Sequence, residues 1–427
     1  MFDYLNSVLT FVESSNLELA LGLFFFTITM ESTRYLLGFI AILIARPWRD
    51  FEHLNDFSSL GKISLIVAGH NEESAIERCV RSLDRQTFKD FEIICVDDGS
   101  TDKTYQIMTR LEREGLIHRA VRLELRGGKA SALNMAMRLA KGDIYIILDA
   151  DSKLEDTAVE EVLRPLLMEP NMAAVSGTVL LENPDQSIIT RCQAVEYAVG
   201  IPVGRTLNAM LDQLVLVSGA FGAFRANAVK HVNGMDVGPG EDFDVCLRMR
   251  AMGYNIGFTH KSLCYTEAPH AAYNLVRQRL RWERDAVWIR FRKLSFQLNP
   301  FSPKFRAKEL FHTLDFLVLT IIPSFVAPLS LFFLFLNASV EFVLMVLLAT
   351  QVLLTVIDSA NLIFSSIMLK RPDVLKLLPW VPVNGMFTSY IMRMVRLFSY
   401  IDEWIFSRSL HDDFAPFKVQ NYGTGYR

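Results

Sequence analysis

Long apolar stretches lie toward both ends of the chain and flank a segment that is rich in charge. The first covers residues 17–45, and two more cover residues 311–336 and 340–368. Because a helix needs about 20 apolar residues to cross the hydrocarbon core of a bilayer, each stretch predicts a transmembrane helix. The first is long for one helix and short for two. We therefore expect one tilted span whose Glu31 and Arg34 face protein or an interface.

A fourth apolar segment covers residues 377–405 and allows two interpretations. Its Pro379, Pro382 and Gly385 favour either a span with a break or a segment that lies partly in the interface. Four polar residues are expected at membrane depth, namely Asp358, Asn361, Arg393 and Arg396. They indicate either a polar path across the membrane or buried pairs between helices.

Positive charge gathers on one side of these spans. Basic residues follow the first and third spans: Arg46, Arg49, Lys370, Arg371 and Lys376. The connector NASV, between the second and third spans, has none. Because cytoplasmic loops carry the excess of Lys and Arg, this asymmetry predicts a multi-pass protein of the cell inner (plasma) membrane with residues 47–310 in the cytoplasm. The start of the chain, MFDYLNSVLTFVESSN, lacks the basic residues of a cleaved signal peptide.

Short β-branched runs alternate with helical patterns between residues 60 and 180. The runs predict strands at 62–69, 91–100 and 143–152, and the patterns predict helices at 71–86, 101–115 and 127–142. We expect Asn71 and Thr101 to cap the first two helices and Gly115 to end the second. The alternation predicts an α/β fold with a Rossmann-like, mostly parallel sheet that helices cover on both faces.

Composition excludes several classes of protein. A net charge of −3 over 427 residues gives no reason to expect nucleic acid as a partner. The five cysteines are scattered and show no C-x-x-C spacing, so neither a disulfide framework nor a zinc site is expected. This cysteine usage is typical of a domain in a reducing cytoplasm.

Carboxylates end two of the predicted strands. Asp97 and Asp98 end the second, and Asp149 and Asp151 end the third. In open α/β sheets ligands bind beyond the carboxyl ends of the strands. Asp149 and Asp151 can reach one cation from a turn, and oxygen ligands with a diphosphate suit Mg²⁺ or Mn²⁺. Asp97 and Asp98 can accept hydrogen bonds from a base or ribose, or fix an Asx-turn. Local capping is the alternative for both pairs.

Two further motifs begin predicted helices. Gly127-Gly128-Lys129 suits a phosphate at a helix N-terminus with a lysine beside it, although a solvated lysine in a loop is the alternative. Gly240-Glu241-Asp242 offers a general base held ionised by the helix dipole. Its alternative is plain capping of a helix by acidic residues.

The stretch VRQRLRWERDAVWIRFRK (276–293) is strongly basic. On a helix, Gln278, Arg281, Trp282 and Asp285 share one face, and Arg279 points elsewhere. Arginine forks match phosphate oxygens, and an indole ring can stack on a sugar. An amphipathic helix on the membrane surface explains the arginines equally well, but it does not explain why Gln278 and Trp282 share the face of Arg281.

These motifs together resemble the membrane-embedded processive family 2 glycosyltransferases, namely the cellulose, chitin, hyaluronan and poly-N-acetylglucosamine synthases. The resemblance rests on seven motifs in the family's order: HNEES (70–74), DDGS (97–100), GKASALN (128–134), DAD (149–151), VSGAFGAFR (217–225), GED (240–242) and QRLRW (278–282). The last fits the family signature Q-(Q/R)-x-R-W at every position. The family implies a GT-A fold joined to transmembrane helices.

The resemblance also implies roles for single residues. Asp97 and Asp98 would bind the uridine of a UDP-sugar, and Lys129 would contact the nucleotide. Asp149 and Asp151 would bind Mg²⁺ or Mn²⁺ on the diphosphate. Asp242, in the same acidic motif as Glu241, would be the general base. The QRLRW residues Gln278, Arg279, Arg281 and Trp282 would close over the diphosphate and the acceptor end.

We therefore expect an inverting, processive synthase that extends a β-linked polysaccharide from a UDP-sugar, with UDP-N-acetylglucosamine as the first candidate, and moves it across the membrane. Its expected partners are the UDP-sugar, the growing polysaccharide, the lipid bilayer and possible accessory export proteins. A non-processive enzyme acting on a lipid or short acceptor is the alternative. A catalytically dead subunit that binds a nucleotide sugar as a signal is less consistent with intact acidic motifs.

The chain departs from the family pattern at three places. Ala68 stands where proline is common, Asp285 stands where glycine often follows W-x-R, and the acidic motif has Gly240 before Glu241. The expected division is an N-terminal transmembrane segment, a cytoplasmic GT-A domain, amphipathic interface helices with QRLRW, C-terminal transmembrane helices and a tail. Their bounds are 1–46, 47–270, 271–310, 311–405 and 406–427.

Overall fold

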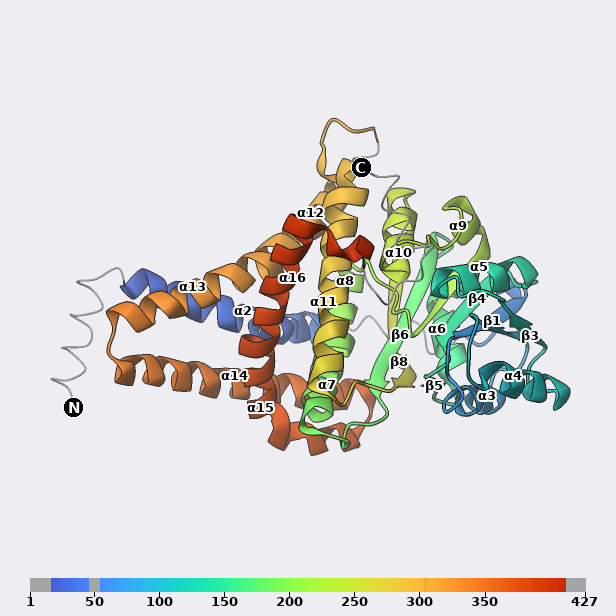
Figure 1. Cartoon of the computed structure of the whole chain (residues 1–427), viewed down its shortest axis with the longest axis horizontal. Helices are drawn as coiled ribbons and strands as arrows, with labels where there is room; N and C mark the ends of the chain where they lie inside the picture. Colours follow the sequence, from blue (N-terminus) through green and yellow to red (C-terminus); the bar gives the residue numbers. More distant parts are fainter. Residues whose placement is uncertain (1–16, 46–53, 304, 412–427) are drawn as a thin grey trace.

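A computed structural model of the chain describes residues 17–45, 54–303 and 305–411. The predictions for the first 16 residues, for Arg46 and Arg49 and for most of the tail lie outside these residues. Figure 1 shows a sheet with its helices at one end of the molecule, and long helices that extend away from it at the other end.

Eight strands form one sheet in the order β3-β2-β1-β4-β7-β6-β8-β5. Their bounds are β1 Ile63–Gly69, β2 Glu92–Asp97, β3 Arg119–Arg122, β4 Ile144–Asp149, β5 Lys153–Leu154, β6 Met172–Leu181, β7 Phe221–Arg225 and β8 Asn255–Thr266. Strands β1 to β4 run parallel, and so do β6 and β8, whereas β7 runs antiparallel to both of its neighbours and β5 runs antiparallel to β8. The predicted α/β fold with a mostly parallel sheet is confirmed.

Strand β1 shows how the sequence builds the core on both faces of the sheet. Successive side chains of a strand point to opposite faces. Leu65 and Val67 accordingly lie in one buried cluster, and Ile66 lies in the other. The first cluster is covered by α3 (Ile76–Asp84), α4 (Thr104–Arg113) and α6 (Ala158–Met168), and the second by α5 (Lys129–Leu139), α9 (Ala226–His231) and α10 (Glu241–Ala251).

The strand register brings the acidic turns together. Strand β1 lies between β2 and β4, with Gly69 opposite Asp97 and Ala68 opposite Asp149. The carboxyl ends of the three strands therefore meet at one edge of the sheet, as expected for a ligand site.

Two predicted helix caps are wrong. Helix α3 begins at Ile76 and not at Asn71, and α4 begins at Thr104. Asn71 has a positive φ of 60°, and its Oδ1 accepts a hydrogen bond from the Thr101 amide at 2.9 Å. These two residues therefore join neighbouring loops at the edge of the sheet. Gly115 does end α4, with a φ of 78°.

Three helical runs are long and apolar enough to cross a membrane within the described residues. Helix α2 covers Leu17–Ala45 as one helix, as predicted. The second run joins α12 (Ala307–Phe316), a π-helical turn at Leu317–Ile321 and α13 (Ile322–Asn337), and the third is α14 (Val340–Leu369). Arg34 pairs with Asp315 at 3.1 Å, so this charge on α2 faces protein.

The fourth apolar segment forms α15 (Val381–Met386), a π-helical turn (Phe387–Met392) and α16 (Arg393–Phe406). Helix α16 lies beside α11 (Ala272–Trp288), which carries QRLRW and ends in a π-helical turn at Ile289–Lys293. Between β6 and β7 the chain forms α7 (Ile188–Val199), a π-helical turn (Gly200–Gly204) and α8 (Arg205–Met210). Short 3₁₀ helices occur at Ser58–Leu60, Ser295–Leu298 and Arg408–His411, and a longer one of nine residues covers Pro372–Trp380.

Candidate active site

A cavity of about 1040 Å³ lies at the carboxyl ends of β1 and β4, and its lining continues onto α2, α14 and α16. Ten of the residues predicted from the sequence line it: Asp98, Lys129, Asp149, Asp151, Glu241, Asp242, Gln278, Arg279, Arg281 and Trp282. Side chains from distant parts of the chain therefore meet around one space.

Asp97 and Asp98 have different surroundings. Asp97 is fully buried, and its Oδ1 accepts a hydrogen bond from the Ser100 amide at 3.1 Å, which is the turn that we considered as an alternative. Its other oxygen lies 3.4 Å from Nε of Arg122. Asp98 lines the cavity and accepts hydrogen bonds from the amides of Gly127 and Gly128 at 2.8 and 2.9 Å. Asp98 therefore fixes the glycine loop that begins α5.

Lys129 is the first residue of α5 and is not a solvated loop lysine. Its Nζ forms an ion pair with Asp149 and donates to the carbonyl oxygen of Gly219 at 2.9 Å. It also lies 4.0 Å from Oε1 of Glu241. Burial raises the pKa of Asp149 to about 6, although the positive charge of Lys129 acts in the opposite direction. The ammonium group of Lys129 is therefore fixed between the carboxylates of Asp149 and Glu241.

Asp149 and Asp151 fit a divalent cation that is shared with a substrate. Asp151 accepts hydrogen bonds from Ser152 Oγ at 3.0 Å and from Thr266 Oγ1 at 3.4 Å, which orient its carboxylate. Within the described residues, no three His, Cys, Asp or Glu side chains are grouped to hold a metal ion. Mg²⁺ is commonly held by one or two carboxylates together with substrate phosphates, so two carboxylates are sufficient here.

Glu72 also lines the cavity, although no function was predicted for it. It lies in the motif HNEES, close to the two aspartates. Burial, together with the negative charges of Asp151 and Asp149, raises the pKa of Glu72 to about 7. The concentration of acidic groups here is what a bound cation would offset.

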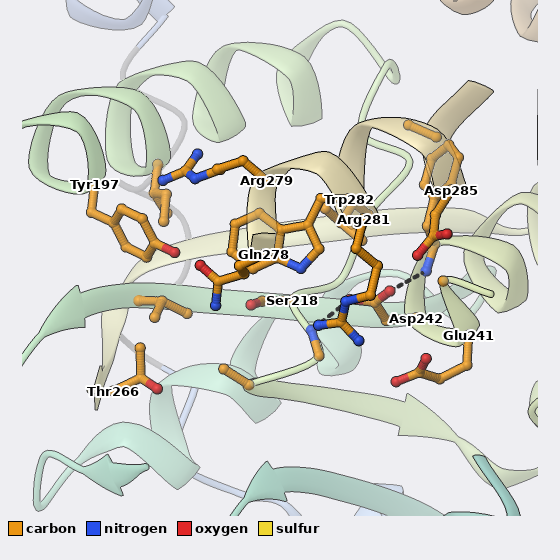
Figure 2. A pocket seen from close by; sticks show the side chains of 18 of the residues that line it. Tyr197, Ser218, Glu241, Asp242, Thr266, Gln278, Arg279, Arg281, Trp282 and Asp285 are labelled. Atoms are coloured by element: carbon orange, nitrogen blue, oxygen red, sulfur yellow. Dashed lines mark hydrogen bonds between the residues drawn. The ribbon is translucent and has the colours of Figure 1, made fainter. Parts of the chain in front are cut away.

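Asp242 lies in the first turn of α10, after Gly240, which has a left-handed conformation with a φ of 61°. Its Oδ2 accepts from the Gly219 amide at 2.9 Å, and its Oδ1 accepts from the Phe243 amide at 2.8 Å (Figure 2). Burial and the charge of Glu241 raise the pKa of Asp242, and Lys129 opposes them. Asp242 is therefore an oriented carboxylate at the cavity wall whose pKa lies above the ordinary range of an aspartate.

Helix α11 brings the predicted face of QRLRW to the cavity. Figure 2 shows Gln278, Arg281 and Trp282 extending from α11 toward the strand side, where Ser218 and Asp242 lie. The indole of Trp282 is 39% exposed, which leaves its ring accessible to a sugar. Arg279 also lines the cavity, but its guanidinium makes a bidentate ion pair with Glu196 at 2.6 and 2.8 Å. Arg279 therefore holds α11 against α7.

Asp285, which departs from the family pattern, packs over the start of α10. A Cβ atom placed on Gly240 would lie 3.3 Å from Cβ of Asp285 and 2.9 Å from Cδ1 of Ile289. The side chain of Asp285 therefore occupies space that a side chain at position 240 would need, which glycine leaves open. Asp285 is 8% exposed and lines the cavity near Glu241 and Asp242.

The polar residues at membrane depth divide between the two interpretations. Asp358 and Arg396 line the cavity, as a polar path requires. Arg396 also fits the other interpretation, because it forms ion pairs with Glu31 of α2 at 3.4 Å and with Glu283 of α11 at 3.3 Å. Arg393 instead donates to the carbonyl oxygens of Thr27 and Pro323, and Asn361 donates to the carbonyl oxygen of Ser32. The same cavity includes Asn384, which is 5% exposed and whose Oδ1 has no hydrogen-bond partner in the part of the chain that the structure describes.

Several other cavity residues were not found from the sequence. Tyr197, Arg205, Ser218 and Thr266 line the cavity. The motif VSGAFGAFR contains Ser218 and was a usable signal for it. Arg205 lies in IPVGRTLNAM, where neither spacing nor periodicity marks it.

Comparisons with known proteins agree with this geometry. Residues 64–232 match the family model described as Glycosyl transferase family 2. A poly-beta-1,6-N-acetyl-D-glucosamine synthase from Staphylococcus epidermidis is 28% identical over 249 residues, which is 58% of this chain and 58% of that protein. The enzyme of the same name from Staphylococcus aureus (strain COL) is 29% identical over 52% of this chain and 53% of its own length. The matched segment thus spans little more than half of these curated relatives.

One solved structure shares the fold over most of its length. It is a mannosyltransferase from Pyrobaculum calidifontis in complex with GDP-Man and Mn²⁺. The two chains are 18% identical and superpose with a TM-score of 0.59, covering 88% of this chain and 99% of the other. The match confirms the expected GT-A fold.

Proposed function

We propose, from the premise that this chain is a membrane-embedded glycosyltransferase with a family 2 catalytic domain, that it is an inverting, processive enzyme. It extends a β-linked polysaccharide from a UDP-sugar, with UDP-N-acetylglucosamine as the preferred donor, and moves the product across the membrane. The observation that carries this proposal is the cavity, whose lining runs from Asp242 past Trp282 to Asp358 on the apolar helix α14 and Arg396 on α16. A growing chain can leave the reaction site along this lining.

The reaction follows from the arrangement of the side chains. Asp242 takes the proton of the acceptor hydroxyl as that oxygen attacks the anomeric carbon. The bond to UDP breaks on the opposite side, so the configuration inverts. The leaving diphosphate needs no proton if its charge is offset. Arg281 lines the cavity, and its guanidinium would offset this charge. One carboxylate base is then sufficient, whereas a glycosidase requires two carboxyl groups.

The same geometry supports the nucleotide and metal sites that we propose. Asp98 and Lys129 would contact the nucleotide, and Asp97 would act by holding the turn. Asp149 and Asp151 would hold Mg²⁺ or Mn²⁺, which supplies positive charge to the diphosphate when it is bound. The surplus of Lys and Arg after the first and third spans supports a cytoplasmic catalytic domain between residues 47 and 270. Accessory export proteins would then act on the opposite side of the membrane.

A donor panel tests this function. The purified chain in lipid vesicles is given UDP-N-acetylglucosamine, other UDP-sugars and one GDP-sugar, and nucleotide release is measured before mass analysis of the product. We expect release from UDP-N-acetylglucosamine and a ladder of long products. Products of one or two added sugars would favour the non-processive alternative. Release from the GDP-sugar alone would contradict the UDP assignment.

Trp282→Ala is expected to weaken binding of the acceptor more than binding of the nucleotide. Loss of a stacking surface costs about 1 kcal/mol, so the KM for a short acceptor should rise about fivefold while UDP affinity is unchanged. Tyr273→Ala is the matched control, because Tyr273 is an exposed aromatic residue on the same helix and lies outside the cavity lining. An equal loss of acceptor and UDP binding would count against stacking.

A further inference from the structure

Arg205 is a charged residue of the cavity that the reaction above does not use. It is the first residue of α8, and burial lowers the pKa of its guanidinium. Within the described residues no carboxylate lies within 4.0 Å of it, and its Nη1 donates to Oγ of Ser176 at 2.8 Å. Arg205 is half-buried and lines the cavity, so its guanidinium is partly removed from water without an ion pair, and a role for this group is expected.

Ser176 connects this arginine to the turn beside Asp242. It lies on β6 and is fully buried. Its Oγ accepts from Arg205 and from the Ser218 amide at 3.2 Å, and donates to the carbonyl oxygen of Gly177 at 3.2 Å. A hydroxyl group can donate one hydrogen bond and accept two, so every position of this one is used.

The Ser218–Gly219 turn in turn holds two groups of the site. The Gly219 amide donates to Asp242, and the Gly219 carbonyl oxygen accepts from Lys129, both at 2.9 Å. A Cβ atom on Gly219 would lie 2.9 Å from Oδ2 of Asp242 and 3.1 Å from Nζ of Lys129. Because the contacts are this close, a small shift of the turn moves the carboxylate of Asp242.

Helix α8 is also fixed to transmembrane helix α2. Asn208 accepts a hydrogen bond from Nη2 of Arg34 at 3.0 Å. Leu207 packs so closely on Gly38 that a Cβ atom there would lie 2.7 Å from its Cδ2. The hydrogen-bonded and packed contacts therefore run from α2 through α8 and Ser176 to Asp242.

We propose that Arg205 is a positioning residue that acts through Ser176 to hold the Ser218–Gly219 turn, and with it Asp242, in register with transmembrane helix α2. This inference rests on the proposed role of Asp242 as the base. It predicts that Arg205 affects the transfer step more than donor affinity, because Lys129 is held by its ion pair with Asp149 as well as by the turn.

The test measures kcat and donor KM for Arg205→Gln, Ser176→Ala and the double variant in vesicles. A misplaced catalytic group costs about 10- to 100-fold, so each single variant should lose that much in kcat, with donor KM within about twofold. Because both act through one contact, the double variant should be no slower than the slower single variant. Arg205→Lys keeps a donor for Ser176 and should recover part of the rate.

Two control variants separate positioning from general loss of stability. Ser262 is also fully buried in the sheet and donates to the carbonyl oxygen of Ala158 at 2.6 Å, so Ser262→Ala removes a comparable hydrogen bond, made to α6 and not to the Ser218–Gly219 turn. Arg225→Gln removes an arginine whose Nε and Nη2 donate to the carbonyl oxygens of Met172 and Leu166. Both should lower the unfolding temperature without a comparable loss of kcat.

The outcomes are distinguishable. Losses that multiply in the double variant, or a raised donor KM at unchanged kcat, would show that Arg205 contacts the substrate and would overturn the proposal. The proposal would also be overturned if Ser176→Ala and Ser262→Ala had the same kcat. Absence of sugar transfer by the unaltered protein would instead contradict the proposed function. If Arg205→Gln fails to fold, Arg205→Lys and Ser176→Ala give the same comparison.

Discussion

Asp242→Asn should reduce sugar transfer about 1000-fold and leave UDP binding intact. Asparagine keeps the size of the side chain, and its single oxygen can still accept the hydrogen bond from the Gly219 amide while the one from the Phe243 amide is lost, so the turn should stay in place. It cannot take a proton from the acceptor hydroxyl, and a general base contributes about 10²- to 10⁴-fold to a rate. Transfer is measured as UDP release in the presence of acceptor, and binding by calorimetry with UDP.

Glu241→Gln is the discriminating partner of this variant, because Glu241 lies next to Asp242 and lines the same cavity. This variant removes a neighbouring negative charge but keeps Asp242, so the loss of transfer activity should be small. Transfer by Asp242→Asn within tenfold of the unaltered protein would refute its assignment as the base. A full loss in Glu241→Gln with a mild one in Asp242→Asn would move the assignment to Glu241.

Asp149→Asn should lose metal-dependent turnover by about 100- to 1000-fold, since charge stabilisation by a bound metal is worth several kcal/mol. The unaltered protein should lose activity in a chelator and regain it with Mg²⁺ or Mn²⁺. The variant should not be restored at the same metal concentration, and Asp151→Asn should behave alike. Binding of Mn²⁺ in the presence of UDP, followed by electron paramagnetic resonance, gives a second measurement independent of activity.

Asp143→Asn is the matched control for the metal variants. Asp143 lies just before the opposite end of β4 and accepts a hydrogen bond from the Lys62 amide at 3.0 Å. Its loss should leave the metal dependence unchanged. Full activity of the unaltered protein in a chelator would refute the metal role of Asp149 and Asp151.

The sheet could be predicted from the sequence because its signals are local. Buried strands such as β1 and β4 are short apolar runs, and the helices between them have their own period. Parallel strands with such connections place their carboxyl ends together, so the meeting of Asp98 with Asp149 and Asp151 was foreseeable. The antiparallel position of β7, between β4 and β6, was not, because it depends on pairing between distant segments.

The errors have a common physical cause. Asn71 and Thr101 have the residue types of helix caps, but their polar groups bond to each other across two loops. Asp97 and Asp98 are adjacent, and which one faces the cavity depends on the exact end of β2. Arg205 and Ser176 have no pattern in the sequence, since their contact exists only when α8 packs over β6.

The packing of Leu207 on Gly38 has a consequence for the lipid environment. A transmembrane helix tilts when the hydrocarbon thickness around it changes. Helix α2 cannot tilt without moving α8, so the acyl chain length of the surrounding lipid should alter the rate of transfer while the donor KM is unchanged. The thickness of the bilayer would then affect the rate of transfer, in addition to the bilayer surrounding the transmembrane helices.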